Sequence, residues 1–170
     1  TNTAAAVATL TWALLSYWQT KKMSAVGAAS GAVAGLVAIT PASGFVGPMG
    51  AMGIGFAAGL ICYFAVRYRP KLGVDDALDV FAVHGVGGTI GALATGIFAT
   101  AAISGFTPPA GDGWINGHAA QMWTQLRAVL ATFGYSLVVT FVILKVLDLV
   151  PGLGLRASDK AEDDGLDVSE

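Results

Sequence analysis

Charged side chains are scarce in this sequence. Its 170 residues include 11 Asp and Glu and 9 Lys and Arg, which makes 12% charged residues, whereas an average soluble domain has about 25%. Hydrophobic residues make up 55% of the chain, and the mean hydropathy is +0.68. This composition argues against a soluble globular protein and indicates a membrane protein. The net charge of −2 leaves no basic excess that would indicate a nucleic-acid partner.

Residues with reactive or metal-binding side chains are also few. The single cysteine, Cys62, lies in an apolar run and has no second cysteine with which to form an internal disulfide. The glycine-rich segment Gly85–Gly91 has no Lys followed by Ser or Thr, the pair that a phosphate-binding loop needs, so helix packing is the better interpretation. The sequence contains no nucleophile–base arrangement and no cluster with metal-ligand spacing. We therefore expect no enzyme activity, no metal and no cofactor.

Five apolar runs account for most of the chain. Each is interpreted as one helical crossing of the hydrocarbon core, which takes about 20 residues. In the second run Gly27, Gly31 and Gly35 recur every four residues, which places them on one helix face where another backbone can approach closely. The predicted fold is an all-α polytopic membrane protein, with about five transmembrane helices in residues 1–150 and a polar, non-membranous tail in 151–170. The predicted helices lie near residues 3–18, 24–39, 48–68, 75–104 and 119–150.

Basic residues follow alternate runs. They occur after the first, third and fifth runs, whereas the linkers after the second and fourth runs contain none. Because cytoplasmic loops carry the excess of Lys and Arg, this alternation predicts that the N-terminus of the chain is outside and the C-terminus is cytoplasmic. The basic residues are Lys21 and Lys22, then Arg67, Arg69 and Lys71, and finally Arg156 and Lys160.

His84 is the strongest candidate for a functional residue. It follows Asp75, Asp76 and Asp79, carboxylates of the kind that stabilise a helix N-terminus. The 84 − 76 = 8 residues correspond to about 12 Å of α-helix, so His84 is expected inside the bilayer. An ionisable residue there is costly and indicates function, although a histidine that only bonds to a neighbouring helix is the alternative. For Asp79, a proton relay and a helix-start role are both open.

Three separated segments resemble the C-terminal part of the ammonium transporter family (Amt/Mep/Rh), particularly its Amt branch. They are SAVGAASGAVAGLVAITPASGFV at Ser24–Val46, DDALDVFAVHGVGGTIGALATGIFA at Asp75–Ala99, and the tail elements GLR at Gly154–Arg156 and GLDVSE at Gly165–Glu170. The resemblance implies the last five helices of an eleven-helix, inverted-repeat transporter in the cell (inner or plasma) membrane. It also implies a homotrimer with one pore per subunit, ammonium or ammonia as substrate, and a role in nitrogen metabolism.

The resemblance further implies roles for individual residues. His84 occupies the position of the second of two pore histidines that relay or orient the deprotonated substrate. The first pore histidine and the outer gate of the family belong to an N-terminal part that lies outside these 170 residues. The tail resembles the regulatory segment that adjoins the docking surface for PII-type signalling proteins. The expected pore residues are His84 and Val80, with Asp76, Asp79, Phe81, Ser30 and Thr40 in support, and Gly154, Leu155, Arg156, Gly165, Leu166 and Asp167 in the regulatory tail.

Two of these assignments also have a physical argument. Val80 lies 84 − 80 = 4 residues before His84, so the two share a helix face and Val80 would wall the cytoplasmic side of the pore. Ser30 and Thr40 are small polar residues of the second run, which are expected to bond across helices. Two other functions remain as alternatives: an ammonium-sensing or scaffold membrane protein without net transport, and a small helical membrane subunit unrelated to ammonium.

Overall fold

The computed structural model describes residues 1–73, 76–108, 111–150, 155, 157, 160, 161 and 165. All regular structure in these residues is helical, and no strand occurs among them, which confirms the predicted all-α class. The chain divides into two compact units, Thr1–Val129 and Leu130–Glu170. Four of the expected tail residues, Gly154, Arg156, Leu166 and Asp167, lie outside the described residues.

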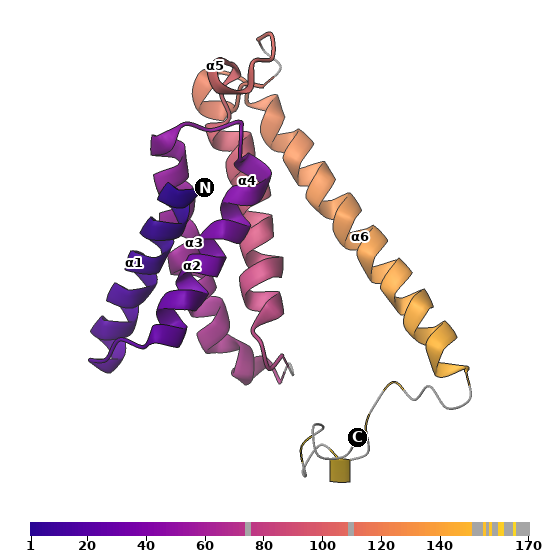
Figure 1. The fold of residues 1–170 in the computed structure, drawn as a ribbon. Helices are drawn as coiled ribbons and strands as arrows, with labels where there is room; N and C mark the ends of the chain where they lie inside the picture. The colour runs from indigo at the N-terminus through magenta and orange to yellow at the C-terminus, as the bar shows by residue number, and fades with distance from the viewer. Residues whose placement is uncertain are drawn as a thin grey trace. The chain divides into compact units, whose positions relative to one another are not determined.

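Most of the helices lie within the predicted apolar runs, and Figure 1 shows their order along the chain. Ser24 shows why one of them starts where it does, because its side chain accepts a hydrogen bond from the backbone N–H of Gly27 and caps the helix that follows. The helices are α1 (Asn2–Thr20), α2 (Ala25–Ile39), α3 (Pro48–Tyr68), α4 (Val86–Phe98), α5 (Ala101–Ser104) and α6 (Ala120–Asp148), with short turns η1 (Thr40–Ala42), η2 (Arg69–Leu72), η3 (Phe81–Gly85) and η4 (Trp114–Asn116).

Small residues hold the first unit together. Helix α1 packs against both α2 and α3, and its Ala4 is fully buried between Gly35 of α2 and Gly55 of α3. A Cβ added at Gly35 would lie 2.6 Å from the carbonyl oxygen of Ala4. The close backbone approach that the glycine spacing predicts is therefore confirmed, and Gly31 contacts α1 in the same way.

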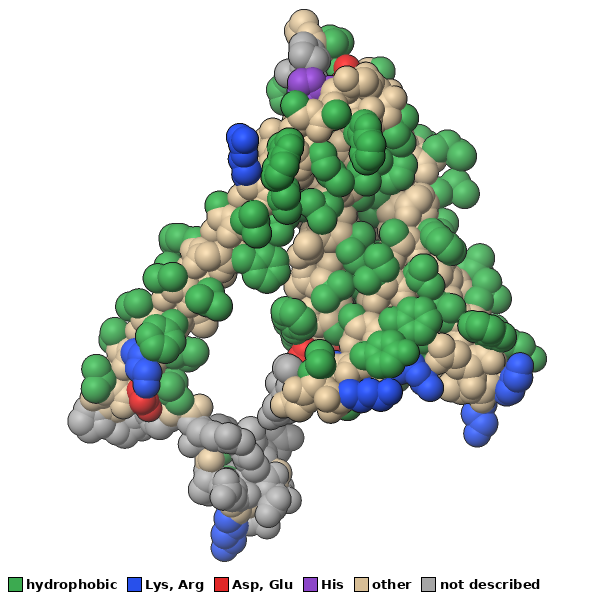
Figure 2. Space-filling model, turned by 180° about the vertical axis from the view of Figure 1, so that it is seen from behind, with side chains coloured by type: hydrophobic (Ala, Val, Ile, Leu, Met, Phe, Trp, Pro, Cys, Tyr) green, Lys and Arg blue, Asp and Glu red, His purple; other side chains and the backbone are tan. Residues whose placement is uncertain are grey.

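Four segments are long and apolar enough to cross a membrane. They contain α2, α3, α4 and α6 and span Ala25–Ala42, Pro48–Leu72, Phe81–Phe98 and Ala120–Asp148. Helix α1 has 19 residues but is not among these segments. Hydrophobic side chains cover much of the surface in Figure 2, and Lys and Arg gather where α1 and α3 end. The protein is accordingly a multi-pass membrane protein.

The fourth predicted run, 75–104, is not one continuous helix. Asp79 has a left-handed backbone with φ 55°, which separates the preceding turn from the helical residues that start at Val80. After Phe98 the chain is extended at Ala99 and Thr100 before α5 begins. The helical part that could cross a bilayer is therefore Phe81–Phe98, shorter than predicted.

The segment between α5 and α6 has only the short turn η4 as regular structure among its described residues, and hydrogen bonds tie it to the end of α4. The carbonyl oxygen of Ala99 accepts hydrogen bonds from the backbone N–H of Gly113 at 2.8 Å and from the Asn116 side chain at 2.7 Å. A carboxylate oxygen of Asp112 accepts the backbone N–H of Ala101 at 2.8 Å. These bonds fix the start of α6 against the end of α4.

Candidate functional site

A π-helical turn carries the candidate histidine. This turn, η3, spans Phe81–Gly85 and leads directly into α4. The wider π turn is rare in proteins and often occurs at functional sites. His84 is exposed on the surface of this chain, and Val80 and Phe81 beside it are 50% and 56% exposed.

Asp76 holds the start of this turn. Its two carboxylate oxygens accept the backbone N–H groups of Val80 at 2.9 Å and Phe81 at 2.8 Å. These N–H groups have no partner within the helix, so a carboxylate that binds both stabilises the first turn. Because residues 76–79 are not helical, the expected rise of about 12 Å from Asp76 to His84 along one α-helix is wrong.

Asp79 connects the end of α3 to the same turn. Its carboxylate oxygen lies 2.9 Å from Nη1 of Arg69 in η2, and its carbonyl oxygen accepts the backbone N–H of Val83 at 2.9 Å. Arg69 Nε and Nη1 and Asp79 Oδ1 have no hydrogen-bond partner among the described residues. The contact is therefore an electrostatic pair that is poorly aligned for a hydrogen bond, and it ties two helix ends together.

His84 lines an open recess of about 530 Å³ between α2 and α4. Apart from His84, only one lining residue, Thr40, carries a polar side-chain atom, and its hydroxyl donates to the carbonyl of Leu36 at 2.7 Å. That hydroxyl oxygen still has a lone pair with which it can accept a hydrogen bond. The full lining is Val33, Leu36, Val37, Thr40, Pro41, His84 and Gly88.

Ser30 does not line this recess. Its hydroxyl donates to the carbonyl of Val26 at 3.0 Å, four residues earlier in α2. Thr40 bonds to its own helix in the same way. Among the described residues neither hydroxyl forms the expected bond to another helix, because a Ser or Thr in a helix can reach the carbonyl of the preceding turn.

Gly88 is a recess residue that the sequence reasoning assigned only to helix packing. A Cβ added at Gly88 would meet nothing within 4 Å, whereas one at Gly87 would lie 3.4 Å from atoms of Cys62 and Val37. Gly88 follows His84 by four residues, so the two share a helix face. The four-residue spacing from His84 was the signal in the sequence that could have identified Gly88 as a recess residue. Because Gly88 has no side chain, it leaves space beside the imidazole.

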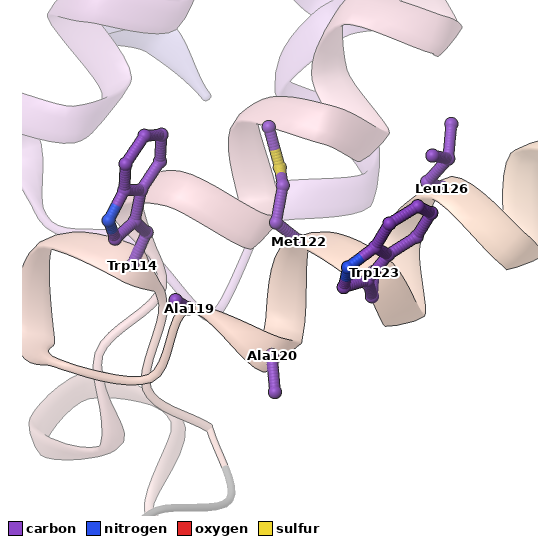
Figure 3. Close-up of a pocket in the computed structure, with 6 residues that line it drawn as sticks. All are labelled: Trp114, Ala119, Ala120, Met122, Trp123 and Leu126. Atoms are coloured by element: carbon purple, nitrogen blue, oxygen red, sulfur yellow. The ribbon is translucent and has the colours of Figure 1, made fainter.

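A separate recess of about 390 Å³ lies at the start of α6. Figure 3 shows its lining, which includes two exposed tryptophans, Trp114 and Trp123. Tryptophan is enriched where a membrane protein meets the headgroup region. This recess has an aliphatic and indole lining, whereas the His84 recess has an imidazole that can exchange a proton.

The His84 recess suits a small neutral molecule that forms hydrogen bonds. A neutral imidazole offers one donor and one acceptor, and the surrounding aliphatic walls offer no countercharge to a bare cation. Among the described residues no group of three or more His, Cys, Asp or Glu side chains could hold a metal ion. The chemistry available at this site is therefore proton exchange and hydrogen bonding in apolar surroundings.

Comparisons with known proteins agree on one family. The model of the Ammonium Transporter Family matches residues 1–170. The chain is 45% identical to the ammonium transporter of Bacillus subtilis over 170 residues, covering 99% of this chain and 41% of that protein. It is 42% identical to ammonium transporter Amt1 of Archaeoglobus fulgidus, covering 100% of this chain and 41% of the relative.

Solved structures have the same fold. The crystal structure of Saccharomyces cerevisiae Mep2 matches with a TM-score of 0.86 and 41% identity, over 94% of this chain and 36% of that one. A sensor Amt protein matches with a TM-score of 0.82 and 31% identity, over 99% of this chain and 40% of that one. The partial coverage agrees with the prediction that the chain corresponds to the C-terminal part of an Amt-type subunit. Because the family model matches residues 1–170 and the identities to named ammonium transporters reach 45%, the chain belongs to the ammonium transporter family.

Proposed function

We propose that this chain forms the C-terminal part of a subunit that moves ammonium or ammonia across a membrane. The observation that carries the proposal is the position of His84 on a π turn at an apolar recess, in a chain that the family model matches throughout. Two relatives named as ammonium transporters, those of Bacillus subtilis and Saccharomyces cerevisiae (MEP2), are 45% and 41% identical to this chain. We infer the substrate of this chain from the names of those relatives.

The physical argument concerns the proton of ammonium. An unpaired cation in an apolar recess is costly because it loses hydration without gaining a countercharge, whereas neutral ammonia is much less so. The imidazole of His84 can accept a proton or orient ammonia by a hydrogen bond. We therefore assign to His84 the relay or orientation of the deprotonated substrate, with Val80 as the cytoplasmic wall.

A working pore requires another protein segment to enclose the exposed surface around His84. The chain spans about two fifths of the length of the curated relatives that it matches, 41% for the Bacillus subtilis protein. We propose that an N-terminal part, of the kind these relatives carry, covers His84, Val80 and Phe81 and supplies a second pore histidine. Asp76 and Asp79 support the site by holding the turn that presents His84.

The remaining proposals concern the whole subunit. The chain starts outside and ends in the cytoplasm of a cell (inner or plasma) membrane, three such subunits form a homotrimer, and the tail takes part in control by a PII-type protein. The alternating basic linkers support the orientation. The residues proposed for the tail include Leu155 and Gly165, together with others outside the described residues.

Sensing without net transport is the second candidate function. It is favoured by the likeness to the structure of a sensor Amt protein, at 31% identity. The identities to proteins named as transporters are higher, 45% for Bacillus subtilis. Uptake by reconstituted protein separates the two, because a pure sensor moves no substrate.

The test replaces His84 in a subunit that joins this chain to such an N-terminal part. We expect His84→Ala to lower methylammonium uptake or change the charge moved per substrate, because the recess loses its proton acceptor. His84→Glu should retain proton exchange or admit the cation, since a carboxylate can accept a hydrogen bond and offset the substrate charge. The measurement is uptake and charge movement in reconstituted vesicles.

The second histidine of the chain provides a matched control. His118 lies in the segment before α6 and is not among the residues of the His84 recess, so His118→Ala should leave uptake and charge movement unchanged. Equal uptake and equal charge in wild type, His84→Ala and His84→Glu would make His84 a packing residue and remove the basis of the mechanism.

A further inference from the structure

Gly88 is the position at which the wall of the His84 recess has no side chain. It lines the same recess of about 530 Å³ as His84. A Cβ added at Gly88 would meet no atom of the described residues within 4 Å. The space in front of its α-carbon therefore belongs to the recess.

Two neighbouring glycines of α4 hold the helices on either side of this space. A Cβ at Gly87 would lie 3.4 Å from Cγ1 of Val37, and one at Gly91 would overlap the backbone of Ala38. These contacts fix the separation of α4 from α2, because a close-packed interface leaves no room for either helix to shift. Helix packing therefore accounts for Gly87 and Gly91, but it does not require a glycine in place of Gly88.

The wall that α2 contributes to the recess is aliphatic. Val33 and Leu36 line the recess and are 39% and 41% exposed, so a molecule inside the recess can contact their side chains. Thr40 supplies the only hydroxyl of the lining, and that hydroxyl already donates to the carbonyl of Leu36. Burying a methyl group against an aliphatic wall raises affinity several-fold. Contact with this wall would therefore favour methylammonium over ammonium.

Lack of room is the property of the recess that can act against a larger substrate. Ammonium and methylammonium carry the same charge, so electrostatic attraction does not separate them. A molecule that forms a hydrogen bond with the imidazole of His84 lies about 3 Å from a ring nitrogen. Gly88 follows His84 by 88 − 84 = 4 residues, or about 6 Å along an α-helix. A methyl group on that molecule is thus within reach of Gly88, where the missing side chain leaves room for it.

We propose that Gly88 sets the size limit for the substrate at His84, so that glycine admits methylammonium as well as ammonium and a side chain there excludes the methylated substrate first. The inference rests on the proposed transport function and deepens it, because it names a residue that decides which amines pass. Proton exchange belongs to His84, whereas Gly88 borders only the part of the substrate that does not react. The N-terminal part proposed to cover the recess supplies the remaining wall.

The experiment compares two substrates in the joined subunit reconstituted in vesicles. Initial rates of ammonium and methylammonium uptake are measured over a range of concentrations, and the limiting rate divided by KM is compared for wild type and Gly88→Ala. One methylene group in an apolar pocket changes discrimination by about 10- to 200-fold. We expect Gly88→Ala to raise the preference for ammonium over methylammonium by about tenfold or more, with the loss falling mainly on methylammonium.

Gly88→Ser separates size from polarity. Its side chain is close to that of alanine in size, and its hydroxyl can bond to the carbonyl of the preceding helical turn. Gly88→Ser should therefore show the same increased preference as Gly88→Ala. A preference that increases in only one of the two variants would contradict a limit set by size.

Gly134→Ala is the matched control. Gly134 lies in α6, a Cβ added there would meet no described atom within 4 Å, and the residue does not line the His84 recess. The substitution gives the same gain in helix propensity as Gly88→Ala. It should keep the preference of wild type.

The outcomes separate the size limit from the proposed function. An unchanged preference in Gly88→Ala, with His84→Ala still altering transport, overturns the size limit and leaves the proposed function in place. A wild type that moves ammonium but excludes methylammonium also overturns the size limit. If Gly88→Ala fails to fold, Gly88 packs against another segment of the subunit, which again overturns the size limit. Absence of uptake of both substrates in wild type overturns the proposed function itself.

Discussion

Asp76 is the residue on which the shape of the His84 turn depends most directly. Its carboxylate binds two backbone N–H groups at the start of the turn. Removing such a cap costs about 1 kcal/mol of stability. We expect Asp76→Ala to lower the unfolding temperature of the joined subunit and to weaken uptake, because the turn that presents His84 frays.

Asp76→Asn is the informative comparison for this prediction. The amide oxygen can still accept one of the two hydrogen bonds, so this variant should lie between wild type and Asp76→Ala. The measurements are thermal unfolding in detergent and uptake in vesicles. Equal unfolding temperatures for all three proteins would show that the cap does not stabilise the turn.

At the scale of elements, glycines in α4 have two different functions. Gly91 faces the backbone of Ala38 in α2 so closely that a Cβ would overlap it, whereas a Cβ at Gly88 would meet nothing within 4 Å. Gly91→Ala should therefore force α2 and α4 apart and destabilise the protein by about 1–3 kcal/mol. Gly88→Ala should leave stability unchanged or raise it by up to about 1 kcal/mol, since alanine favours the helix.

Thermal unfolding of the two variants side by side tests this difference, and each variant is the control for the other. Gly88→Ala should still reduce uptake, because its methyl group enters the recess beside His84. A loss of stability in Gly88→Ala equal to that in Gly91→Ala would mean that Gly88 packs against another segment of the subunit.

At the scale of the whole molecule, the proposed orientation predicts which ends of the helices reach the outside. Ile115 in η4 is 66% exposed. Lys22 is also exposed, and it follows α1, whose C-terminal end lies at the end of the bundle away from α5 in Figure 1. In intact cells, a membrane-impermeant thiol reagent should label Ile115→Cys from outside and should reach Lys22→Cys only after permeabilisation. Cys62 is fully buried, so background labelling should be low. The reverse pattern would invert the topology.

The proposed role of the tail is also a property of the whole subunit. Truncation after Val150 removes the acidic segment and should change the transport rate or its control by a PII-type protein, because a charged, solvated segment is suited to interaction with a partner. The measurement compares uptake by full-length and truncated subunits with and without the PII-type protein. Unaltered rate and control would reduce the tail to a solubilising end.

The sequence by itself determined the class of the protein. Scarce charge and long apolar runs are compatible only with helices that satisfy their own backbone groups in a membrane, and the motifs around Ser24–Val46 and Asp75–Ala99 indicated the family that the comparisons then showed. Glycine spacing also predicted the face of α2 that another helix approaches closely, because periodicity specifies which residues share a helix face, and the structure identifies α1 as that helix.

Only the tertiary structure decided how the candidate site is built. The left-handed backbone of Asp79 and its pairing with Arg69 depend on where η2 lies beside η3, which no local pattern specifies. Whether Gly88 or Gly91 packs against a neighbour depends on the position of α2. Thr40 satisfies its hydroxyl within its own helix. Gln125 lies directly against Gly96 of α4, and the segment before α6 that is hydrogen-bonded to Ala99 brings it there. Each of these features arises from contacts between elements, and sequence periodicity describes one element at a time.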